Sequence, residues 1–125
     1  MRFLLVMLVM FWVTGCAAHD EQYYRLNPVA LQRALEMCPA QSPKTVSCSE
    51  LRAIALNVNE LAFDLRTDPQ GFGLKILSLQ QTIAKQQRDL KSDSAQSEAL
   101  STSLKQNQQE LERRLAIVKW LESPA

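Results

Sequence analysis

The segment from Leu74 to Ser123 contains neither glycine nor proline, and a heptad pattern runs through it. With Ile76 as the first a position, six of the seven a positions are apolar. The a series is Ile76, Ile83, Leu90, Ser97, Leu104, Leu111 and Val118. Only Leu79, Leu100 and Leu121 are apolar among the seven d positions. This pattern is typical of a coiled-coil seam with one weak row, and it predicts helix over 74–122.

Two arrangements of this helix are open. The Ser- and Asp-rich stretch 91–94 is able to turn the chain into a helical hairpin, with Asp93 and Gln96 as a cap pair. The a positions nevertheless keep their register through this stretch, which a turn has no reason to preserve. We therefore expect one helix of about 75 Å, counting 1.5 Å per residue. Such a helix needs another protein, a second copy with self-association through residues 76–121, or the solvent tolerance that its many glutamines and charged residues supply.

The N-terminus reads as an export signal. Arg2 precedes an unbroken apolar run of eleven residues, 3–13, which is shorter than the roughly 20 apolar residues of a membrane-spanning helix. Val13-Thr14-Gly15-Cys16 resembles a bacterial lipobox. That resemblance implies cleavage before Cys16, a diacylglycerol on its sulfur and an acyl chain on its amino group. The alternative is an ordinary signal peptide with an incidental cysteine.

These signals predict a signal peptide over 1–15 and a lipidated cysteine with its tether over 16–26. An aspartate directly after the lipidated cysteine would resemble the inner-membrane retention signal, but this chain has Ala17 there. We therefore expect the protein in the outer membrane of a Gram-negative bacterium, on its periplasmic side. Removal of Arg2 leaves 13 basic and 13 acidic residues. The balance lacks the electrostatic footprint of a nucleic-acid binder, so we expect no nucleic acid among the partners.

Cys38 and Cys48 are the other two cysteines. In an oxidising compartment such a pair forms a disulfide. Closing a loop of about eleven residues stabilises a small domain by about 2.8 kcal/mol in the chain-entropy model. A metal site is the competing interpretation, but the only histidine, His19, lies beside the anchor and no CxxC motif occurs. We therefore expect a disulfide and no metal.

Two helices are expected around this pair. Asn27-Pro28 opens the first, with Asn27 as cap and Pro28 at the first helical position. One apolar face carries Leu31, Ala34, Leu35 and Cys38, and Pro39 ends the helix. Ser47 and Glu50 form a capping box for the second helix, which should end near Arg66. A two-helix module over 27–66 and a Pro- and Gly-containing loop over 67–73 follow.

The motifs at the N-terminal end resemble a known family. A lipobox followed by Tyr23, Tyr24, Asn27, Pro28, Leu31, Leu35, Cys38, a Pro-containing loop and Cys48 is similar to the entry-exclusion lipoproteins of conjugative type IV secretion systems. The resemblance covers residues 13 to about 55. It implies an outer-membrane lipoprotein that limits redundant mating, or a module recruited to the outer-membrane complex of a secretion system.

Enzyme interpretations have little support. A single histidine disfavours acid–base pairs and triads, and Gly71-Phe72-Gly73 lacks the pattern of a phosphate loop. Asp64, Asp68 and Lys75 are better read as a solvated helix end than as a nuclease cluster. We expect no enzyme, no cofactor and no catalytic residue.

The expected fold is all-α, a small disulfide-stapled helical hairpin followed by a long, coiled-coil-like helix. The expected function is protein–protein contact in the cell envelope, with envelope or secretion-system proteins as partners. The alternative is a structural coiled-coil lipoprotein subunit of such a complex. Three smaller points are open. Tyr23 and Tyr24 either pack on the first helix or dock a partner, and Phe72 is either packed under the loop or exposed as a hydrophobic contact. Trp120 either packs beside a charged helix face or belongs to a tip that faces the membrane or the peptidoglycan.

Overall fold

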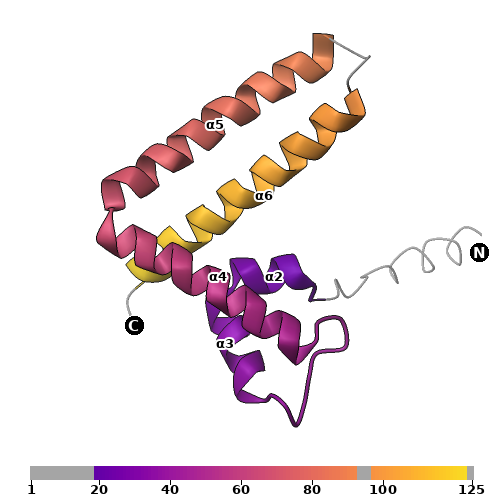
Figure 1. The fold of residues 1–125 in the computed structure, drawn as a ribbon, viewed down its shortest axis with the longest axis vertical. Coiled ribbons are helices and arrows are strands. Elements are labelled where there is room, and N and C mark those ends of the chain that lie inside the picture. The colour runs from indigo at the N-terminus through magenta and orange to yellow at the C-terminus, as the bar shows by residue number, and fades with distance from the viewer. Residues whose placement is uncertain (1–18, 93–96, 124–125) are drawn as a thin grey trace, which may run out of the picture.

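The computed structural model describes residues 19–92 and 97–123, and every regular element in these ranges is a helix. Three helices pack together: α2 (Glu21–Leu26), α3 (Pro28–Glu36) and α4 (Cys48–Thr67). Helices α5 (Pro69–Ser92) and α6 (Ser97–Glu122) run antiparallel and project from them as a hairpin (Figure 1). The predicted all-α class is confirmed, and α6 is a C-terminal helix of 26 residues.

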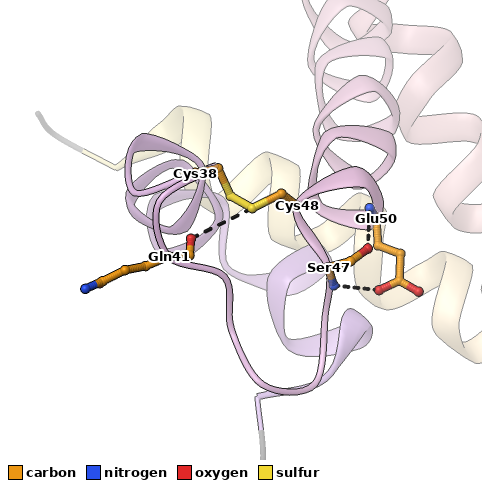
Figure 2. Close-up of a disulfide and its surroundings, with 5 residues drawn as sticks. All are labelled: Cys38, Gln41, Ser47, Cys48 and Glu50. Atoms are coloured by element: carbon orange, nitrogen blue, oxygen red, sulfur yellow. Dashed lines mark hydrogen bonds between the residues drawn. A yellow bond between two sulfur atoms is a disulfide. The ribbon is translucent and has the colours of Figure 1, made fainter.

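The predicted disulfide is present and joins Cys38, two residues beyond the end of α3, to Cys48, the first residue of α4 (Figure 2). The predicted capping box is also present. The Glu50 backbone N–H donates to Ser47 Oγ over 3.1 Å, and the Ser47 N–H donates to Glu50 Oε2 over 2.7 Å. Gln41 brings its carbonyl oxygen to 3.8 Å from Cys48 Sγ, a contact only, because a disulfide sulfur carries no proton. The start of α4 is thus fixed both covalently and by its cap.

Two Asx-Pro pairs each join two helices through a single residue. Asn27 lies between α2 and α3, and Asp68 lies between α4 and α5. Their backbone angles are similar, φ −127° and ψ 77° at Asn27 against φ −141° and ψ 74° at Asp68. A following proline disfavours helical angles at the residue before it, so each pair ends one helix and begins the next.

The two side chains cap in opposite directions. Asn27 Nδ2 donates to the Tyr23 carbonyl over 2.8 Å and so closes the end of α2, without the predicted cap on α3. Asp68 Oδ1 instead accepts from the Gly71 N–H over 2.9 Å at the start of α5. Each junction therefore satisfies a backbone group that a helix end leaves without a partner.

Two predicted boundaries need correction. Residues 16–26 were expected to be a tether, but 21–26 form α2, capped by Asp20 and buried through Tyr24. Residues 67–73 were expected to be a loop, but only Asp68 interrupts the helices there. Pro69 suits the first position of a helix, and Gly71 and Gly73 are tolerated within its first turns because Asp68 caps it.

The single helix expected over 74–122 is two helices, so the hairpin is the correct alternative. The physical reason is burial, because α5 and α6 cover each other's seam and a lone helix would leave it in water. Leu79 and Ile83 of α5 are buried. Gln86 donates to Ser103 Oγ over 2.9 Å and accepts from Asn107 Nδ2 over 3.0 Å, both on α6. The predicted cap pair, Asp93 and Gln96, lies outside the described residues.

The core lies where the last turns of α6 return to α2 and α4. Ile117 of α6 and Leu51 of α4 are fully buried, and Ile54 is 1% exposed. Burial of each such side chain contributes about 1.5–3 kcal/mol. The other members of the cluster are Tyr24, Leu31, Val46, Val58, Leu61, Ala62 and Phe72. Within the described ranges, no helix has the length and hydropathy needed to cross a bilayer.

Candidate protein-binding groove

An open groove of about 200 Å³ lies where α3, α4 and α6 meet. Its lining residues are Pro28, Leu31, Gln32, Leu35, Ala55, Val58, Asn59 and Trp120. The helical spacing of 28, 31 and 35 places all three residues on one side of α3, where Pro28 and Leu31 are buried and Leu35 is partly buried. Three of the residues that carry the family resemblance therefore line one groove.

The groove has no ionisable side chain among the described residues that line it. Gln32 and Asn59 are exposed amides at its rim and provide hydrogen-bond donors and acceptors. The remaining lining is apolar, apart from the indole N–H of Trp120. This composition suits the binding of an apolar side chain with a few directional hydrogen bonds.

A second hollow of about 330 Å³ continues the groove on the other side of Pro28 and Trp120. It is lined by Leu26, Asn27, Pro28, Val29, Ala30, Arg33, Ala116, Lys119, Trp120 and Ser123. Here the charged residues are Arg33 and Lys119. Val29, which is 49% exposed, lies in the same lining as these two cations.

The other predicted site residues lie elsewhere. Tyr24 is 6% exposed in the core, in agreement with the packing interpretation. Tyr23 packs edge-on against Tyr24 with ring centres 5.2 Å apart, and its other neighbour is the His19 ring at 3.9 Å. Asn27 lines the second hollow. Cys16 lies outside the described residues.

The tyrosine cluster is tied to the disulfide loop. The Thr45 hydroxyl donates to the His19 carbonyl oxygen, which joins the chain just before α2 to the loop between α3 and α4. Val46, the next residue of that loop, is 1% exposed and belongs to the core. The loop is therefore held at three points, by the disulfide, by Val46 and by Thr45.

The residues that the enzyme interpretation weighed do come together. Asp64, Asp68 and Lys75 line a shallow hollow at the α4–α5 junction, together with Arg114 of α6. Two carboxylates and two cations balance each other there. Over residues 19–92 and 97–123, no cluster of three or more His, Cys, Asp or Glu side chains is placed to hold a metal ion.

Sequence reasoning missed Trp120 as part of the groove. It lies 92 positions after Pro28, and only the return of α6 as a hairpin brings it against α3. The available signal was the residue type, because tryptophan is rarely placed on a solvated helix face without a packing or binding role. Comparison with protein-family models, with curated proteins and with solved structures found no match to this chain.

Proposed function

We propose that this chain is an outer-membrane lipoprotein that faces the periplasm and acts by protein–protein contact, as an entry-exclusion or accessory lipoprotein of a conjugative type IV secretion system. One observation carries the proposal. Pro28, Leu31 and Leu35, which belong to the family-like motif, line the same groove as Trp120. Pro28 and Leu31 are also buried, so the same face of α3 packs on the core and borders the opening that Trp120 reaches.

The composition of the groove supports a contact role. Interface energy concentrates in a few buried aromatic and apolar anchors surrounded by polar residues that exclude water. Trp120 and Leu35 are partly buried and provide such anchors, and Gln32 and Asn59 provide a polar rim. An incoming apolar side chain would complete the packing of both anchors.

A mating assay tests the proposal. Recipient cells that express the chain should accept a conjugative plasmid less often than recipients that lack it. The double substitution Gln32→Arg and Asn59→Arg puts two charges at the groove and should restore transfer. The matched control is Gln81→Arg with Gln106→Arg, two exposed glutamines on the α5–α6 hairpin, which should behave like the wild type. Equal transfer into all four recipients excludes entry exclusion.

The anchor needs its own test, since it is separable from the groove. Cells fed an alkyne-labelled palmitate should label the wild-type chain, and fractionation should place it in the outer membrane. Cys16→Ala should lose the label and leave the outer-membrane fraction. Label retained by Cys16→Ala contradicts lipidation at this position.

A second candidate function is a structural subunit of an envelope or secretion-system complex. The observation in its favour is the projecting α5–α6 hairpin (Figure 1), on which Leu74 and Leu77 are 60% and 49% exposed. Under this alternative the hairpin joins a neighbouring subunit, including a second copy through residues 76–121. Stable co-purification with secretion-system outer-membrane proteins, together with unchanged mating frequencies, favours this role over entry exclusion.

A further inference from the structure

The groove and the second hollow form one continuous surface with two different chemistries. Pro28 and Trp120 belong to the lining of both. On one side of this pair the lining is uncharged and mostly apolar, with Leu31, Leu35 and Val58. On the other side Arg33 from α3 and Lys119 from α6 face the same hollow. A ligand that extends past Pro28 and Trp120 from one hollow into the other meets both chemistries.

The lining of the second hollow contains two cations and no acidic residue. Among the described residues, the cations that take part in an ion pair are Arg25, Lys85, Arg113 and Arg114, so Arg33 and Lys119 belong with the larger group of cations that do not. No aspartate or glutamate of the described chain lines either hollow. Glu36 and Glu122, the nearest acidic residues along α3 and α6, are exposed and lie outside both linings. Within its lining, the second hollow thus offers cations and no carboxylate beside the apolar groove.

From this charge pattern we infer that the occupant is a segment of another protein that presents a bulky apolar side chain followed by a carboxylate. The apolar side chain packs in the groove against Leu35 and Trp120, and the carboxylate lies between Arg33 and Lys119. This inference rests on the contact role proposed above and specifies the chemistry of the partner.

The two halves contribute differently. Desolvation of the apolar anchor supplies most of the affinity, because Trp and apolar side chains dominate interface energies. The exposed cations sit at the rim, where a charge pair is worth about 0.2–1 kcal/mol and acts mainly on the association rate. Complementary charge therefore selects which apolar segment binds and in which direction.

Photo-crosslinking in living cells tests the inference on the full chain. A photoreactive benzoylphenylalanine replaces Gln32 in the groove, or Gln81 on α5 as the control position, in cells that also carry a conjugation system. The expected result is an adduct at position 32 only. Mass spectrometry of that adduct should locate the crosslink in a partner peptide with an aspartate, a glutamate or a C-terminal carboxylate within a few residues of a large apolar residue.

Charge variants make the test specific. Arg33→Glu with Lys119→Glu should reduce the adduct about tenfold, a change of about 1.4 kcal/mol. Arg88→Glu with Lys105→Glu, an exposed pair on the hairpin, should leave it unchanged. Circular dichroism of both variants checks that the helices are intact.

Other products overturn the inference. An adduct to lipid, to a second copy of this chain, or to a neutral or basic peptide shows that the groove serves a different occupant. Equal adduct yields from the two charge variants do the same, and so does the absence of any adduct at position 32. The mating assay is independent of these results, so the contact chemistry and the entry-exclusion role fail separately.

Discussion

The guanidinium carbon of Arg114 lies 5.0 Å from the centre of the Phe72 ring. Phe72 is 4% exposed in the first turns of α5, and Arg114 comes from α6 with a side chain that is 14% exposed. Glu110 holds the same guanidinium through an ion pair of 2.8 Å. The contact fastens the base of the hairpin to the junction between α4 and α5, and it identifies Phe72 as a plug.

We expect Phe72 and Arg114 to be energetically coupled. A double-mutant cycle with Phe72→Leu and Arg114→Met keeps much of the apolar volume and removes the cation–π contact. A partly desolvated contact of this kind should give a coupling of about 1 kcal/mol in the free energy of unfolding. Urea unfolding of the four proteins measures it. If the stability losses of the two single variants add up to the loss of the double variant within about 0.3 kcal/mol, the prediction is contradicted.

The two glycines beside Phe72 should respond in opposite ways to alanine. A Cβ at Gly71 collides with the carboxylate of Asp68, whereas a Cβ at Gly73 meets nothing within 4 Å. Gly71→Ala should therefore displace the cap of α5 and cost about 1 kcal/mol. Gly73→Ala should stabilise the protein by up to about 1 kcal/mol through helix propensity. Thermal unfolding followed by circular dichroism gives both signs, and equal shifts would disprove the capping role of Asp68.

Removal of the disulfide should destabilise the module without changing its helices. Cys38→Ser with Cys48→Ser should lower the free energy of unfolding by about 2.8 kcal/mol, the value for a closed loop of about eleven residues. Urea unfolding of the wild type after reduction should give the same loss. A wild type that is equally stable with and without reductant rules out a stabilising role for the bond.

Burial on α6 predicts a large difference between two nearby positions. Ile117 is fully buried and Leu115 is 44% exposed. Ile117→Ala should cost about 2–5 kcal/mol because it opens a cavity between α6 and the packed helices. Leu115→Ala should change stability by no more than about 0.5 kcal/mol. Chemical denaturation measures both, and similar losses mean that α6 does not return to the core.

The hydrogen bond between Gln86 and Asn107 should give strongly non-additive substitutions. Gln86→Leu alone, or Asn107→Leu alone, leaves a partly buried amide without its partner and should cost about 1–3 kcal/mol. The double leucine variant removes both polar groups and should be close to the wild type or more stable. If the double variant loses the sum of the single losses, the two helices do not meet at this register.

Local sequence signals predicted the local structure well. Ser47 and Glu50 three residues apart identified the start of α4, and the expected disulfide is present. Asn27-Pro28 identified the start of α3 because proline fits only the first helical turn. Asp68-Pro69 carries the same signal, but Gly71 and Gly73 obscured it and the stretch was interpreted as a loop.

Local sequence patterns could not predict how the helices pack against one another. The heptad register of 76–118 is compatible with one continuous helix and with a helical hairpin, because the apolar seam lies on the same residues in both arrangements. Burial of the seam decides between them, and burial depends on where α6 lands. The groove could not be predicted as a whole for the same reason, since Trp120 reaches Pro28 only after the hairpin has formed.

The tie between Thr45 and His19 limits how far the protein can stand from its membrane. Two residues, Ala17 and Ala18, separate Cys16 from His19, and the three extended Cα-to-Cα steps between them span only about 10–11 Å. With the lipid on Cys16 that we propose, this short connection would keep the disulfide loop close to the lipid headgroups. This part of the protein would then lie within reach of proteins that are embedded in or anchored to the same bilayer.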